Sequence, residues 1–125
     1  MTAHRYLLIS ERNSFAQALV SSAIELDDEL KVVQNPTEAI AHIERTKPDA
    51  VLWELDAMDR EGVVACHNLR RHANVPIVML VNPSATEQIV RGYRLGADAY
   101  LPIPFDRREF TARIQALLRR LAHSV

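Results

Sequence analysis

The sequence predicts a single α/β domain built on a parallel β-sheet, with helices packed on both faces of the sheet. Short apolar segments alternate along the 125 residues with longer segments whose apolar residues recur at helical spacing. Several of the short segments are almost continuously apolar, which is typical of strands covered on both faces. Strands that alternate with helices favour parallel pairing through right-handed crossovers. A chain of this length is sufficient for one core.

Five segments are expected to form the strands. The most continuously apolar are DAVLWEL (49–55) and PIVMLV (76–81), which we expect to be covered on both faces. The other three expected strands are YLLIS (6–10), KVVQ (31–34) and AYLPI (99–103).

Capping residues indicate where the helices begin and end. Asn35 is a suitable N-cap, with Pro36 at the first helical position and Glu38 two residues later. This second helix is expected to stop before Pro48, because proline disfavours helical geometry in the residue before it. Two further pairs have the spacing of N-terminal caps. Ser84 with Glu87 starts a helix that is expected to end at Gly96, and Asp106 with Glu109 starts the last helix.

Apolar stripes predict the buried face of each helix. The five stripes are Phe15, Leu19, Ala23 and Leu26; Ala39, Ile40 and Ile43; Val63, Cys66 and Leu69; Ile89, Val90 and Tyr93; and Phe110, Ile114, Leu117 and Leu121. Five strands and five helices in this order predict one doubly wound domain of the flavodoxin-like kind over residues 1–125.

Composition narrows the class of protein. The single Cys66 excludes a disulfide framework and a multi-cysteine zinc site. The chain has no apolar run long enough to span a bilayer, and its start does not resemble a signal peptide, so we expect a cytoplasmic protein with no membrane partner. A net charge of −1 argues against direct nucleic-acid binding by this domain. Five arginines in residues 106–125 form either a solvated helix face or a basic junction to a nucleic-acid-binding module.

Functional residues of doubly wound sheets lie beyond the carboxyl ends of the strands, near the switch in strand order. Glu11 and Glu54 end two strands that we expect to be neighbours, so two carboxylates can converge there and bind Mg²⁺ weakly. Alternatively, each is an exposed strand-end residue. The sequence has no glycine-rich nucleotide cradle and no recognisable catalytic triad, so we expect neither an enzyme nor a firmly bound cofactor.

The chain resembles the receiver domain of bacterial response regulators over essentially its whole length. The segments that carry the resemblance are PDAVLWEL (48–55), VPIVMLV (75–81), GADAYLPIPF (96–105) and EFTARIQALLRR (109–120). The last two are similar to receivers that precede a winged-helix DNA-binding domain. The resemblance implies a phosphoryl-accepting aspartate after the third strand, assisted by two Mg²⁺-binding acids, a Ser or Thr, and a Lys.

At the positions of this chemistry the sequence departs from the family. The departures are Glu54 at the acceptor position, Ser10 beside Glu11 at the acidic pair, Val81 at the hydroxyl position and Ile103 at the lysine position. Tyr100 does match the aromatic switch position. A displacement of about 1 Å costs on the order of 10²-fold in rate, and glutamate is one methylene longer than aspartate. The loss of a cation and of a metal ligand weakens the transfer further, so we expect no phosphorylation cycle.

These departures leave several functions open. The leading hypothesis is a regulatory module that controls a DNA-binding output through protein contacts, either fixed in one state with Glu54 as a phosphate mimic or with an inert Glu54 that faces solvent or Arg12. The alternatives are a phosphorelay acceptor that uses Asp56 or Glu54, and a pocket that senses a small molecule or an ion.

The resemblance also implies a homodimer through the fourth helix, the fifth strand and the fifth helix. Asp98, Glu109, Arg113 and Arg120 match charged positions expected on that face. Ile89 stands where a basic residue is usual, and Ala99 where a second acid is usual. Exposed ion pairs contribute only ~0–1 kcal/mol each, so these two departures do not exclude the dimer. Alternatively, the charges are simply solvated.

Overall fold

The computed structural model describes residues 3–10, 14–55, 60–72, 74–81 and 96–122. Within these residues, five strands form one parallel sheet and four helices pack against it. The strands are β1 (Arg5–Ile9), β2 (Glu29–Val33), β3 (Ala50–Leu55), β4 (Ile77–Val81) and β5 (Ala99–Pro102). The helices are α1 (Phe15–Ala23), α2 (Pro36–Thr46), α3 (Arg60–His72) and α5 (Arg107–Ala122).

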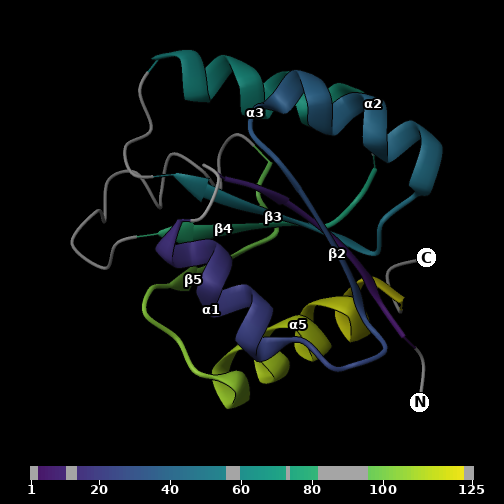
Figure 1. Ribbon diagram of the computed structural model, residues 1–125. Helices are drawn as coiled ribbons and strands as arrows, with labels where there is room; N and C mark the ends of the chain where they lie inside the picture. Colours follow the sequence, from purple (N-terminus) through teal and green to yellow (C-terminus); the bar gives the residue numbers. More distant parts are fainter. Residues whose placement is uncertain (1–2, 11–13, 56–59, 73, 82–95, 123–125) are drawn as a thin grey trace.

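The strand order is β2-β1-β3-β4-β5, with every neighbouring pair parallel. Helices α1 and α5 cover one face of the sheet, and α2 and α3 cover the other (Figure 1). The predicted doubly wound fold is therefore confirmed, and each expected strand overlaps an observed one. The helix expected through Ile89, Val90 and Tyr93 lies outside the described residues. None of the described helices is long and apolar enough to cross a membrane.

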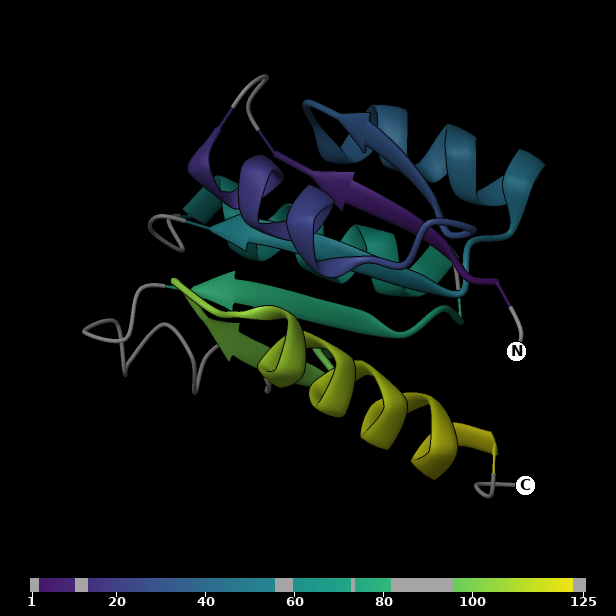
Figure 2. The same ribbon diagram turned by 60° about the horizontal axis from the view of Figure 1, so that its bottom comes forward.

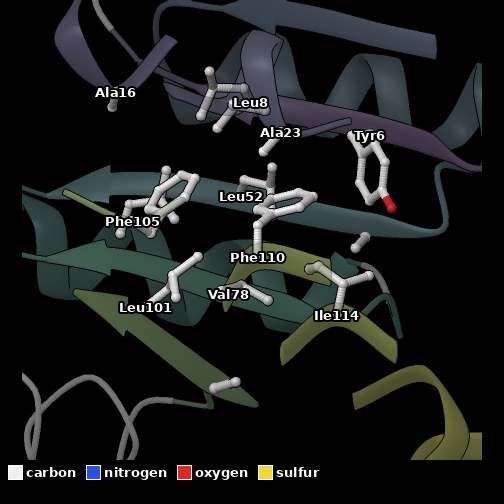
Figure 3. Close-up of a cluster of buried hydrophobic side chains, with 14 of the residues drawn as sticks. Tyr6, Leu8, Ala16, Ala23, Leu52, Val78, Leu101, Phe105, Phe110 and Ile114 are labelled. Atoms are coloured by element: carbon white, nitrogen blue, oxygen red, sulfur yellow. The ribbon is translucent and has the colours of Figure 1, made fainter. Parts of the chain in front are cut away.

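Two hydrophobic clusters, one on each face of the sheet, form the core. On the side of α1 and α5, Phe110 packs against both Tyr6 and Phe105, with ring centroids 5.7 Å apart in each pair (Figure 3). On the side of α2 and α3, Cys66 and Leu69 are fully buried, as their apolar stripe predicts. Helices therefore cover both faces of the sheet, and the carboxyl ends of the strands lie at its edge.

Side-chain caps hold the helix starts where the sequence predicts them. Asn35 accepts a hydrogen bond from the backbone N–H of Glu38 at 2.9 Å. Asp106 accepts one from the N–H of Glu109, also at 2.9 Å, while the Glu109 carboxylate accepts from the N–H of Asp106. These contacts satisfy N–H groups that have no partner within the helix. They confirm the second and last predicted helix starts.

The buried face predicted for the first helix is partly wrong. Phe15 is 62% exposed and Leu26 is fully exposed. The helix ends at Ala23, so Leu26 lies beyond it in the connection to β2. The residues that face the sheet are Ala16, Val20 and Ala23, with Leu19 partly buried. Leu19 and Ala23 were predicted correctly, whereas Ala16 and Val20 were missed.

A hydrogen-bonded arginine ties α3 to the start of β5. The Arg70 guanidinium donates to the Gly96 carbonyl, to the Val75 carbonyl at 2.9 Å and to the Asp98 carboxylate at 2.6 Å. Asp98 also accepts from the backbone N–H of Ile77 at 2.8 Å. Both side chains of the Arg70–Asp98 pair are about three-quarters buried, since their exposed fractions are 25% and 24%. The pair therefore fixes the entry to β5 relative to α3.

We predict that Arg70→Met lowers the free energy of unfolding by about 1–3 kcal/mol, because it removes the guanidinium that donates to the Asp98 carboxylate and to two carbonyls. Chemical denaturation followed by circular dichroism measures the change. The matched control is Arg71→Met, which removes an exposed arginine from the same helix and is expected to change stability by less than about 0.5 kcal/mol. Equal effects of the two substitutions would contradict the structural role of Arg70.

Burial protects the only cysteine of the chain. It raises the pKa of the Cys66 thiol above its ordinary value of 9.0, and the nearby Arg70 opposes this only partly. In the folded protein we expect a disulfide reagent to label Cys66 at least about tenfold more slowly than in the urea-unfolded chain. Because the folded state holds this proton more tightly, the thiol's contribution to stability falls as pH rises above 9.0. Equally fast labelling of folded and unfolded chain would show that Cys66 is accessible.

Candidate functional site

The strand order brings the candidate residues of β1 and β3 together. All strands point their carboxyl ends toward the same edge of the sheet (Figure 2). Chain order reverses direction at β1, which lies between β2 and β3, so the crevice next to β1 is the switch point at which doubly wound sheets place their sites. Ile9 is in register with Trp53, which places Ser10 beside Glu54 at this edge.

A short hydrogen bond joins these two residues. The Ser10 hydroxyl donates to Glu54 Oε1 at 2.7 Å. Ser10 is 4% exposed, and its backbone N–H donates to the Val33 carbonyl of β2. Both the hydroxyl and the backbone that carries it are therefore fixed. A hydrogen bond to an ionised group contributes about 1.5–3 kcal/mol, more than a neutral one.

This hydrogen bond is the last of three hydrogen bonds in series that begin at the first turn of α1. The backbone N–H of Gln17 donates to Ser14 Oγ at 3.0 Å, which makes Ser14 the N-cap of the helix. Ser14 Oγ lies 2.6 Å from Ser10 Oγ. Because the one hydroxyl hydrogen of Ser10 goes to Glu54, Ser14 donates to Ser10. The first turn of α1 thus supports the hydroxyl that holds the Glu54 carboxylate.

Sequence reasoning missed Ser14. The signal was present, because Ser14 and Gln17 have the spacing of a capping box before an apolar segment. It predicts the cap but not the second contact, since the cap hydroxyl touches Ser10 only once β1 and α1 are packed together.

The neighbouring strand ends are apolar. Val81, at the hydroxyl position, is 3% exposed. Ile103, at the lysine position, is half-buried and packs against the cluster under α1 and α5. The backbone N–H of Ile103 donates to the Val81 carbonyl at 2.9 Å, so the two positions are adjacent. Neither side chain offers a donor or a charge to a group bound near Glu54.

The described residues at this edge offer one carboxylate, that of Glu54, to a cation. Mg²⁺ is usually held by one or two carboxylates within an octahedral set of oxygens. Ser10 is neutral, and its hydrogen is directed at the one described carboxylate, that of Glu54. Glu11, Asp56 and Arg12 lie outside the described residues.

A second group of predicted residues lies where β5 meets α5. Tyr100 is half-buried, and the Arg113 guanidinium lies 5.7 Å from its ring centroid, within the range of a cation–π contact. Arg120 donates to the Asp98 backbone carbonyl at 2.9 Å. The structure therefore gathers these four predicted residues on one charged surface.

Two acids expected on the dimer face have other roles within the chain. The Asp98 carboxylate serves the Arg70 pair and the N–H of Ile77, and Glu109 serves the cap of α5. Two of the expected charges are thus already engaged within the chain. Ile89 lies outside the described residues.

Sequence comparison identifies the family. The response regulator receiver domain matches residues 7–115. The DNA-binding response regulator MtrA of Mycobacterium tuberculosis is 34% identical over 116 residues, which cover 93% of this chain and 51% of MtrA. The sensory transduction protein RegX3 of Mycolicibacterium smegmatis is 34% identical over 114 residues, which cover 91% of this chain and 50% of RegX3. The chain thus spans about half the length of these curated relatives.

Solved structures agree on the fold. A putative response regulator from Chloroflexus aurantiacus superposes with a TM-score of 0.81 at 24% identity, covering 95% of this chain and all of that one. A two-component response regulator from Clostridium difficile has a TM-score of 0.79 at 26% identity and covers 94% of this chain and 98% of its own. With the match over residues 7–115, these similarities lead to one conclusion: the chain belongs to the response regulator receiver domain family.

Proposed function

We propose that this receiver domain signals through protein contacts without entering a phosphorylation cycle, and that it has no enzymatic activity of its own. The observation that carries the proposal is the 2.7 Å hydrogen bond from Ser10 to Glu54. In the family resemblance, these positions hold a metal-binding acid and the phosphoryl acceptor. Here the acceptor carboxylate is already bonded to the residue that would otherwise help to hold the metal.

This geometry lacks three features that phosphoryl transfer and its signalling require. An attacking carboxylate needs in-line alignment, whereas one Glu54 oxygen is committed to Ser10. Charge on the transferring group needs cations nearby, whereas Ile103 is apolar and half-buried. A phosphoryl oxygen needs a hydroxyl donor to report its presence, whereas Val81 has none. Together these features favour a domain whose state does not depend on phosphorylation.

The Glu54 carboxylate supports a fixed signalling state. It places a permanent negative charge at the carboxyl edge of the sheet, and the chain from Gln17 through Ser14 and Ser10 links this charge to α1. A charge held by oriented donors maintains one arrangement of the surrounding segments. Glu54 thereby acts as a built-in, weak substitute for a phosphoryl group.

The proposed output is control of DNA binding. The relatives MtrA and RegX3 extend to about twice the matched length, and MtrA is described as a DNA-binding response regulator. We infer that this receiver acts on a DNA-binding module, either attached or associated, while it makes no nucleic-acid contact itself. Its net charge of −1 agrees with that division of roles.

Homodimerisation through the surface formed by β5 and α5 is the proposed means of control. Tyr100, Arg113 and Arg120 supply an aromatic ring and two cations on this surface. Arginine and tyrosine are enriched at protein interfaces. The cation–π contact also links the Tyr100 side chain to Arg113, which would lie against the partner in the dimer.

We predict that incubation with Mg²⁺ and acetyl phosphate leaves the intact mass of the chain unchanged. The positive control is the combined variant Ser10→Asp, Glu54→Asp, Val81→Thr and Ile103→Lys, which restores the missing groups and is expected to gain one phosphoryl group. Stoichiometric phosphorylation of the unmodified chain would contradict the proposal. Peptide mapping would then distinguish Glu54 from Asp56 as the acceptor.

We predict that the molar mass measured by light scattering rises from monomer toward dimer with concentration. Arg113→Glu is expected to weaken this association about fivefold, since an exposed ion pair contributes ~1 kcal/mol at most. Arg45→Glu makes the same charge reversal on α2, across the sheet, and is expected to have no effect. A monomer at every concentration, or equal effects of both substitutions, would exclude this dimer.

A further inference from the structure

The Arg70 side chain on α3 reaches the residues that lead into β5, next to the surface formed by β5 and α5. Its Nη2 donates to Asp98 Oδ2 at 2.6 Å, and its Nε and Nη2 both donate to the Gly96 carbonyl. Its Nη1 donates to the Val75 carbonyl, just before β4. Every nitrogen of the guanidinium therefore has an acceptor within this chain.

The backbone before β5 accommodates this arginine. Gly96 has a φ of 111°, a conformation that residues with a Cβ rarely adopt. A Cβ at this position would lie 3.2 Å from both Cγ and Nε of Arg70, closer than ordinary van der Waals contact. Glycine therefore allows the backbone to turn here and the arginine side chain to lie directly against it.

The Asp98 carboxylate is held from a second side. Its Oδ2 also accepts from the backbone N–H of Ile77 at 2.8 Å, and the N–H of Asp98 donates to the Ile77 carbonyl at 2.8 Å. The Asp98 side chain is about one-quarter exposed, so it lies at the surface. Its charge is nevertheless compensated from within the chain by Arg70.

The surface formed by β5 and α5 has few acids for its arginines. A twofold interface brings the same surface of two copies together, so the cations of one copy have to meet acids of the other. The Glu109 carboxylate serves the cap of α5. Arg120 lies beside Asp98, because it donates to the Asp98 backbone carbonyl at 2.9 Å. Asp98 is therefore the acid next to these cations, and it is already paired.

We infer that Arg70 limits the self-association of this domain, because it keeps the Asp98 carboxylate from the α5 arginines of a second copy. This inference rests on the proposed homodimer. An arginine of the second copy that approaches Asp98 meets an acid whose charge is already compensated, and the Arg70 guanidinium repels it. The Arg70–Asp98 pair is thus an autoinhibitory contact, and its loss strengthens the dimer.

The test compares the dimer dissociation constants of the 125-residue chain and its Arg70→Met variant, measured by sedimentation equilibrium at low ionic strength. We expect the variant to dimerise about fivefold more tightly, the gain from one exposed ion pair. The matched control, Arg71→Met, removes the same charge from an exposed position on α3 and is expected to leave the constant unchanged. The gain is expected to shrink at high salt, because salt screens exposed charges.

Two further variants isolate the Asp98 charge. In an Asp98→Asn background, Arg70→Met is expected to lose most of its gain, because asparagine has no charge for the arginine of the second copy. The asparagine still has an oxygen that accepts from the N–H of Ile77. Arg70→Lys keeps a cation beside Asp98 and is expected to keep the weak dimer. A purely structural role of Arg70 would produce neither result.

The circular dichroism spectrum and thermal melt of each variant are measured first, because Arg70→Met is expected to lower stability. If that variant unfolds, Arg70→Gln carries the test, since it removes the charge and keeps an amide donor. A folded variant that dimerises no more tightly than the parent, or an equal gain from Arg71→Met, would overturn this inference and leave the homodimer in place. If the parent and the folded variant are both monomeric at every concentration, the homodimer is excluded as well.

Discussion

The parallel pairing of β1 with β3 sets the geometry of the whole carboxyl edge. Ile9 and Trp53 are in register, so the next residues, Ser10 and Glu54, meet at hydrogen-bond distance. Ser14, which caps α1, supports the Ser10 hydroxyl from the other side. A strand pair that is fully buried has little freedom to slip, because a shift of one residue would turn its apolar side chains to the wrong face. The contact between hydroxyl and carboxylate is therefore a property of the fold and not of a loop.

This contact is the basis of the proposal that the domain does not accept a phosphoryl group. A pocket for phosphoryl transfer needs several charged groups directed at one point. Burying each of these charges costs free energy. Here Val81 and Ile103 are apolar, and the Glu54 carboxylate has a neutral donor. Among the described residues of this edge, Ser10, Ser14 and Glu54 are hydrogen-bonded to one another in series. These features support the proposal of a signalling domain that does not depend on phosphorylation.

Local patterns predicted much of this molecule, and long-range contacts account for the rest. The buried strands and the caps at Asn35 and Asp106 depend on neighbouring residues, and the structure confirms them. The exposure of Phe15 was not predictable from its spacing, because the approach of α1 to the sheet decides which stripe is buried. The bonds from Arg70 to Gly96 and Asp98 span more than 25 residues and leave no local signal. The candidate residues of the carboxyl edge were named from the sequence, but the bond between Ser10 and Glu54 depends on packing.

The most direct measurement of the central claim is a crystal structure of the chain soaked with Mg²⁺ and beryllium fluoride, which bonds to carboxylates that are able to accept a phosphoryl group. The account predicts that the Glu54 carboxylate keeps its hydrogen bond to Ser10 and carries no beryllium adduct. A beryllium–oxygen bond at Glu54, with the Ser10 hydroxyl released, would contradict it.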